Sequence, residues 1–106
     1  MNLLDNRGRP RVAITGLGAI TPHGRGLRAA WDGVCSAQSA IGPIRRFDAR
    51  RFPVTFAAEV EDPGPVDVPE SVQGLALDLK GRLATVAVRE ALQQAGLPAL
   101  GDRVGV

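Results

Sequence analysis

The sequence has one cysteine, one histidine and no tyrosine. A single cysteine, Cys35, cannot form an internal disulfide, which is typical of proteins from a reducing compartment such as the cytoplasm. The single histidine, His23, excludes a multi-histidine metal site, and with Cys35 it falls short of the ligands of structural zinc. No apolar run approaches the about 20 residues of a membrane-spanning helix, and the first residues lack the apolar core of a signal peptide. The sequence predicts a soluble, cytoplasmic chain with no metal and no cofactor.

Lysine and aromatic residues are scarce as well. Lys80 is the only lysine, and the aromatic residues are Trp31 and three phenylalanines. Nucleic-acid-binding proteins interleave aromatic side chains with basic runs, so this composition argues against a nucleic acid partner. Residues 1–51 carry nine arginines and three aspartates, a balance of +6, whereas residues 52–106 carry four basic and eight acidic residues, a balance of −4. The basic residues are scattered, which favours a solvated surface over a docking patch for an acidic partner.

Hydrophobic periodicity predicts two strands. The apolar, β-branched run at residues 11–15, bounded by Gly16, predicts a buried strand. Gly16–Gly18 then predicts a turn, since glycine adopts backbone angles that other residues avoid. Alternation of apolar and polar residues over 54–59 predicts a half-buried strand, and residues 41–44 read as an irregular connector because glycine and proline punctuate them.

Two helices are predicted between and after these strands. The first begins at residues 26–27 and ends at 36–39, with an apolar face that includes Trp31 and Cys35. The second spans residues 75–95, stopped by Gly96. One stripe of this helix holds Leu79, Leu83, Val86 and Glu90, and the next holds small residues suited to close packing against a sheet: Ala84, Val88, Ala91 and Ala95.

The predicted order is strand, helix, strand, helix and then the onset of a strand at residues 103–106. This alternation predicts an α/β fold with layered helices. The chain is long enough for one small domain. We expect residues 1–10 to be a loose lead-in and residues 11–106 to form the domain, with residues 62–69 as a proline-rich loop.

Four local motifs are candidates for a catalytic or ligand-binding site. Gly16 and Gly18 after a strand suggest dinucleotide binding, but Thr21 stands at the third glycine position and Pro22 follows where a helix should run. Cys35 lies near the end of its helix, where the dipole disfavours a thiolate, so we expect a buried, inert cysteine. A histidine in a glycine- and proline-rich loop, as His23 is, is ordinary on a surface, and the spacing does not support a catalytic pair with Cys35.

The fourth motif is a group of arginines around two phenylalanines. Its members are Arg45, Arg46, Arg50 and Arg51, with Phe47 and Phe52. Such a group binds phosphate or an acidic protein in some proteins. It can equally pair with the carboxylates of Asp48, Glu59 and Glu61 on the same surface. The local chemistry therefore predicts no complete active site.

Several segments in order resemble a known enzyme family. The opening strand and loop, residues 11–24, and the stretch Ser39–Asp48 resemble successive signatures of the β-ketoacyl-acyl carrier protein synthases, and Trp31 lies between them where the family usually has an aromatic residue. Residues 56–60, 89–97 and 103–106 resemble the following strand, the end of the long helix and the next strand. Together they span residues 11–106, and the chain is identified as resembling the N-terminal part of such a synthase.

The resemblance implies a thiolase-like α/β fold, here only in part, in an enzyme that is usually a homodimer. The family condenses an acyl chain with a malonyl unit on acyl carrier protein, with loss of carbon dioxide, in fatty acid or polyketide synthesis. It uses a cysteine nucleophile and two histidines, whose chemistry needs a thiolate and donors aimed at the developing negative charge. The resemblance places all three beyond the matched stretch, so no catalytic residue, cofactor ligand or metal ligand is expected here.

One departure keeps other interpretations open. Family members that dock carrier protein commonly have a basic cluster before the long helix, whereas residues 70–79 contain Glu70 and Asp78 and no basic residue. Docking of carrier protein at this surface is therefore in question. The leading hypothesis is a truncated, inactive fragment of the synthase. The alternatives are a non-catalytic subunit resembling the chain-length factors of polyketide synthases and a stand-alone α/β domain without enzymatic activity.

Overall fold

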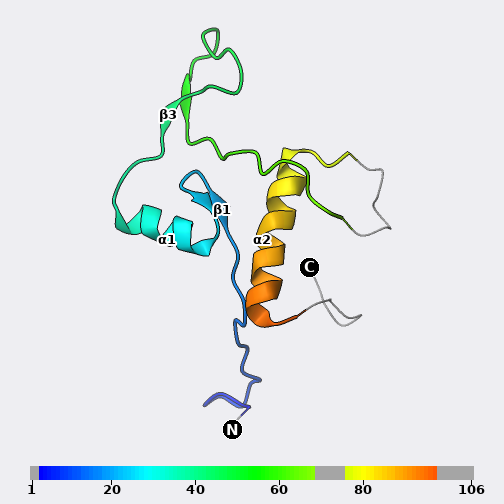
Figure 1. The fold of residues 1–106 in the computed structure, drawn as a ribbon. Helices are drawn as coiled ribbons and strands as arrows, with labels where there is room; N and C mark the ends of the chain where they lie inside the picture. Colours follow the sequence, from blue (N-terminus) through cyan, green and yellow to red (C-terminus); the bar gives the residue numbers. More distant parts are fainter. Residues whose placement is uncertain (1–2, 69–75, 98–106) are drawn as a thin grey trace.

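The structure, a computed structural model, describes residues 3–68 and 76–97 of the chain. Two helices carry most of its regular structure, α1 at Leu27–Cys35 and α2 at Leu79–Ala95. Two antiparallel strand pairs of two residues each complete the described part, β1 (Ile20–Thr21) with β2 (Gly24–Arg25) and β3 (Gly42–Pro43) with β4 (Phe56–Ala57). Figure 1 shows the β1–β2 hairpin between the two helices and the β3–β4 pair projecting away from them.

Both predicted helices are present, and local hydrogen bonds set their ends. α1 follows Gly26, whose φ of 99° is a conformation that favours glycine. α2 begins later than predicted, because Asp78 caps it by accepting a hydrogen bond from Gly81 N at 2.8 Å. At the other end the predicted stop is confirmed: Gly96 has a left-handed φ of 69°, and the N–H of Leu97 reaches the carbonyl of Leu92.

The predicted strand at residues 11–15 is wrong for this structure. The segment is irregular, and Val12 and Ile14 are 93% and 80% exposed. A strand needs a neighbour to pair with its backbone groups. Among the described residues this segment is bonded through Arg11, whose N–H donates to the carbonyl of Leu3 and whose guanidinium donates to that of Leu4. The β-branched residues thus stay unpaired and uncovered.

The other strand predictions need smaller corrections. Within the predicted strand at 54–59, Phe56–Ala57 forms β4 and pairs with Gly42–Pro43, and the carbonyl of Thr55 accepts one further hydrogen bond from the N–H of Ile44. Residues 41–44, predicted to be an irregular connector, therefore contain β3. The predicted loop after residue 62 has no regular structure over residues 62–68. The predicted strand at 103–106 lies outside the described residues.

Gly16 and Gly18 serve close approach to α2, which corrects the predicted turn. Neither has a positive φ. A Cβ at Gly16 would lie 2.0 Å from the carbonyl oxygen of Ala91, and one at Gly18 would lie 1.9 Å from that of Ala87. The small face of α2 therefore does permit close packing, as predicted, but against an extended segment rather than a sheet.

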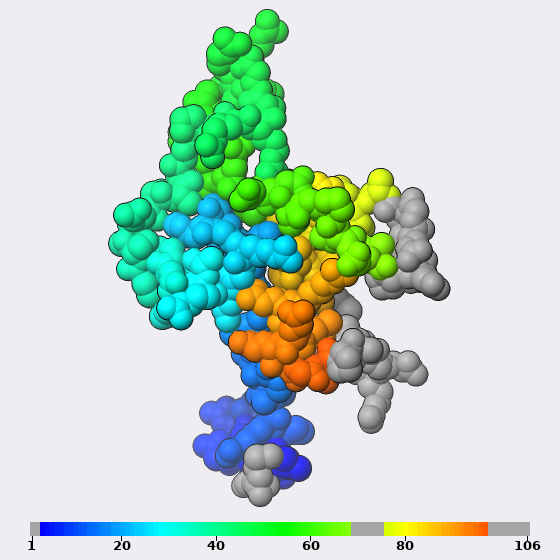
Figure 2. Space-filling model, in the orientation of Figure 1, coloured from blue at the N-terminus to red at the C-terminus, as the bar shows by residue number. Residues whose placement is uncertain are grey.

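The described residues build very little core. Only Ala49 and Val86 among the described hydrophobic residues are buried. The radius of gyration is 18.3 Å, against about 13 Å for a compact domain of 100 residues. Figure 2 shows the cause, since residues around β3 and β4 project at one end of the molecule and N-terminal residues project at the other. The helices and small sheets make the chain α/β in content. Among the described residues, no helix is long and apolar enough to cross a membrane.

Candidate functional site

The main cleft of the described structure has a volume of about 720 Å³. It opens between the β1–β2 hairpin and the segment that follows β4. Charged groups of both signs line it together with the hairpin loop: Ile20–Arg25, Arg45, Arg46 and Glu59–Pro63. The cleft is defined by how three parts are fixed to one another, namely the hairpin, α2 and the base of the β3–β4 pair.

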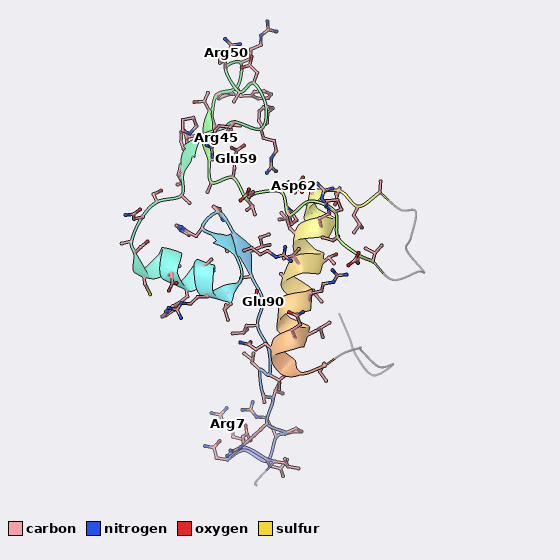
Figure 3. All side chains as sticks on the ribbon, viewed as in Figure 1. Arg7, Arg45, Arg50, Glu59, Asp62 and Glu90 are labelled. Carbon is pink, nitrogen blue, oxygen red and sulfur yellow. The ribbon has the colours of Figure 1, made fainter. Side chains whose placement is uncertain are left out.

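Glu90 of α2 fixes the hairpin at both of its ends. Its carboxylate accepts hydrogen bonds from the backbone N–H of Ala19, at 2.8 Å, and of Leu27, at 2.7 Å. Ala19 precedes β1 and Leu27 is the first residue of α1, so one side chain ties the entry and exit of the hairpin to the long helix (Figure 3). Gly26 permits this approach, since a Cβ there would lie 3.3 Å from Glu90 Oε1.

The charge of Glu90 is stabilised at this position. The N–H of Leu27 first and that of Ala19 second lower the pKa of the Glu90 carboxyl, and the cation of Arg25 lowers it further. The donor at Leu27 is one of the free N–H groups at the N-terminus of α1, where a negative charge is favoured. Glu90 was predicted only as a member of the apolar stripe of the helix. The signal that could have identified its contact role is the presence of a carboxylate in a stripe whose other members, Leu79, Leu83 and Val86, are apolar.

A second side chain of α2 extends the contact along the incoming segment. Gln94 accepts a hydrogen bond from the N–H of Leu17 at 2.6 Å. Gln94 and Glu90 are four residues apart and so lie on one face of the helix. Leu17 and Ala19 are two apart and present their N–H groups to the same side of an extended chain. Two side chains one turn apart on the helix therefore accept hydrogen bonds from alternate N–H groups of an extended segment.

The base of the β3–β4 pair is held by a carboxylate in the same way. Glu59 accepts hydrogen bonds from the backbone N–H of Arg45 and of Arg46, each at 3.0 Å. These two N–H groups, Arg45 first, lower the pKa of the Glu59 carboxyl, and the two arginine cations add to the effect. The Arg46 guanidinium donates to the carbonyl of Val60 at 2.5 Å. Glu59 thus closes one wall of the cleft.

An ion pair connects this wall to the long helix. Arg82 of α2 lies 2.5 Å from Asp62, and it also donates to the carbonyl of Leu77 at 2.7 Å. Arg82 is the first cause of the lowered pKa of Asp62. Further along, Arg89 donates to the carbonyl of Asp67. The segment after β4 is therefore fastened to α2 at two points, while the hairpin is fastened to it by Glu90.

The two single residues that are catalytic candidates, His23 and Cys35, differ in their relation to the cleft. His23 lines the cleft, and its ring packs on α1, since a Cβ at Gly33 would lie 2.2 Å from the imidazole Cγ. Cys35 does not line the cleft. It is exposed, so the predicted buried cysteine is wrong. The face of α1 that was to cover it is open, with Trp31 65% exposed.

The arginine group pairs with neighbouring carboxylates only in part, since two of its four members form such ion pairs in the described residues, Arg50 with Asp48 and Arg45 with Glu59 at 3.9 Å. Asp48 binds Arg50 at 2.7 Å, and Glu59 receives the backbone of Arg45 and Arg46. Glu61, which was also considered, has no ion pair within the described residues. No group of three or more metal-ligating side chains occurs in the part of the chain that the structure describes. The close approach of Gly16 and Gly18 to α2 leaves no space for a pyrophosphate at those glycines.

Comparison with known proteins places these features in a family. The family described as beta-ketoacyl synthase, N-terminal domain, matches residues 9–106. A Streptomyces coelicolor protein named as a beta-ketoacyl synthase 2 of the actinorhodin polyketide is 38% identical over 87 residues, which is 79% of this chain. The 3-oxoacyl-[acyl-carrier-protein] synthase 2 of Coxiella burnetii is 37% identical over 82% of the chain, and that of Synechocystis sp. is 36% identical over 89%.

The similarity covers only part of these relatives. The chain spans 21% of the Streptomyces and Coxiella proteins and 23% of the Synechocystis protein. No solved structure matches the chain. The match nevertheless includes the hairpin, α1, the base of the β3–β4 pair and α2 with Glu90. The chain therefore belongs to the β-ketoacyl synthase family and corresponds to its N-terminal domain.

Proposed function

We propose that this chain is the N-terminal structural segment of a β-ketoacyl-acyl carrier protein synthase. The observation that carries the proposal is the family match over residues 9–106. The enzyme joins an acyl group to a malonyl unit on acyl carrier protein, forming a carbon–carbon bond as carbon dioxide leaves. It acts in the cytoplasm, in fatty acid or polyketide synthesis, as a homodimer with a layered thiolase-like fold.

The role of this segment in the enzyme is to build one wall of the fold. Glu90 fixes the β1–β2 hairpin and the start of α1 to α2, and Asp62 fixes the segment after β4 to Arg82 of the same helix. These contacts fix the hairpin and the segment after β4 relative to α2, and the core that makes the support rigid comes from the rest of the enzyme. A rigid support of this kind is what a catalytic site on other parts of the enzyme requires, because its groups must be held within fractions of an ångström.

The condensation itself uses residues outside this chain. The reaction needs a thiolate that carries the acyl group and hydrogen-bond donors for the oxyanion and enolate. Cys35 is exposed at the end of α1, and His23 is packed on Gly33. Neither residue takes part in the chemistry.

Two assays test the proposal. The purified chain, given acyl and malonyl carrier protein, should release no carbon dioxide and form no β-ketoacyl product. A chimera in which residues 1–106 replace the matching N-terminal segment of the Synechocystis synthase should fold and condense the same substrates. Turnover by the chain alone that disappears in Cys35→Ala would contradict the proposal. A folded but inactive chimera that binds acyl chains would instead favour the non-catalytic subunit.

A further inference from the structure

The segment of residues 41–58, which we call the arm, carries an unusual amount of exposed apolar surface. Five large apolar side chains of the arm are each between 53% and 61% exposed: Ile41, Phe47, Phe52, Val54 and Phe56. They lie on a hairpin that projects from the rest of the molecule (Figures 1 and 2). Scattered exposed apolar residues are normal on a protein surface, but a concentration of them marks an interaction site.

The tip of the arm is held in one shape by its own contacts. The rings of Phe47 and Phe52 meet edge to face, with centroids 5.6 Å apart and an interplanar angle of 78°. The N–H of Phe52 donates to the carbonyl of Ala49 at 2.9 Å, and Ala49 is buried beneath the turn. Arg50 donates to Asp48 through its backbone and its guanidinium. A tip that is ordered before binding loses little conformational entropy when it docks.

The charge of the arm indicates the chemistry of its partner. It holds four arginines and one aspartate, a net charge of +3. Their partner surface should be acidic, since complementary charge gives docking its specificity. The described part of the chain does not offer such a surface. Most described carboxylates after residue 58 are already bound, as the contacts of Glu59, Asp62 and Glu90 show; Asp67 and Asp78 also face cations, at 3.9 and 3.7 Å.

We propose that the arm docks into the part of the β-ketoacyl synthase that lies outside this chain. Phe47 and Phe52 enter an apolar pocket there, and carboxylates on its rim meet the arginines. This inference rests on the proposed function, because the relatives that share this segment have about four-fifths of their length beyond the match. The described residues supply no cover for the arm, so the proposal assigns its cover to that remaining length.

The test compares two pairs of exposed residues in the Synechocystis chimera described above. The arm variant is Phe47→Ser with Phe52→Ser. The matched control is Leu3→Ser with Val34→Ser, which removes two apolar side chains that are 68% and 70% exposed and lie outside the arm. Docking predicts that the arm variant lowers the Tm of the chimera by about 5 °C or more, while the control lowers it by less than about 1 °C.

Three results would overturn the inference, and each is distinguishable. A folded chimera in which both variants have the same Tm contradicts docking and leaves the proposed function in place. A chimera that does not fold with the wild-type arm contradicts the proposed function, and the docking inference falls with it. Sedimentation of the 106-residue chain gives the third: a dimer that the arm variant converts to monomer would identify a second copy as the partner.

Discussion

The hairpin with α2 and the arm are held together in opposite ways. The hairpin is bound to α2 through residues far apart in the sequence, since Ala19 and Leu27 both bond Glu90, which is 71 and 63 residues away. The arm is closed by contacts between residues at most 15 apart in the sequence, as in the pairing of Gly42 with Ala57 and the hydrogen bond from Arg45 to Glu59. The first region has long-range order with little buried surface, and the second has local order with an uncovered apolar surface. Neither region has the core of an independent domain.

The largest expected effect is on the stability of the isolated chain as a whole. We expect the isolated chain to be marginally stable or to aggregate, because Val12, Ile14 and the arm side chains are exposed. Each large apolar side chain left uncovered forgoes about 1.5–3 kcal/mol, against a total domain stability of about 5–15 kcal/mol. Urea and thermal unfolding, with sedimentation to report size, measure this. A soluble monomer with a sharp transition above about 60 °C would show a self-sufficient domain.

Two glycine substitutions compare the regions directly. Gly18→Ala places a methyl group 1.9 Å from the carbonyl oxygen of Ala87, so the segment must move off α2. We expect the free energy of unfolding to fall by about 1–3 kcal/mol. Gly42→Ala in the arm is the control, because nothing lies within 4 Å of its Cβ position, and its effect should stay within about 0.5 kcal/mol. Urea unfolding of the chimera measures both, and equal effects would contradict the close approach.

The pH dependence of stability tests the Glu90 contact. The folded-state pKa of Glu90 is lowered from its ordinary value of 4.5, so the unfolded state binds a proton first as the pH falls. The stabilisation is therefore complete above pH 4.5 and is lost as the pH falls through the folded-state pKa. Glu90→Gln should reduce the loss of stability on acidification, measured as Tm from pH 7 to pH 3.

The comparison in that experiment is between variant and wild type, because other carboxylates titrate in the same range. Asp48, Glu59 and Asp62 also have lowered pKa values, and they respond equally in both proteins. Glu61→Gln is the matched control, since Glu61 forms no ion pair with the described residues. Identical acid profiles for wild type and Glu90→Gln would show that the carboxylate charge does not hold the hairpin.

The smallest effect is expected in the arm. Phe47→Ala removes a large side chain that is 54% exposed, and in the isolated chain it should change the free energy of unfolding by less than about 1 kcal/mol. Val86→Ala is the counterpart in α2, where Val86 is 4% exposed, and it should have the larger effect. Circular dichroism during urea unfolding compares them. A larger loss from Phe47→Ala would show that the arm stabilises this chain by itself.

The elements that could be predicted are those that nearby residues decide. The helix ending at Ala95 follows from periodicity and from Gly96, whose left-handed conformation closes the last turn within five residues. The hydrophobic periodicity predicts too early a start for this helix, because the pattern continues on the N-terminal side of the cap at Asp78. The strand at residues 11–15 was predicted from its β-branched residues, but a strand also requires a neighbour. The sequence pattern does not tell whether that neighbour is present.

The sequence by itself determined the two helices, the family and the expectation that Cys35 and His23 form no catalytic pair. Only the tertiary structure decided that Gly16 and Gly18 serve close approach, and that Glu90 holds both ends of the hairpin. The physical reason is the range of the forces. Caps and periodic faces depend on residues within a few positions of one another, whereas these contacts join groups more than 60 residues apart. The local sequence of either segment does not indicate which distant segment it contacts.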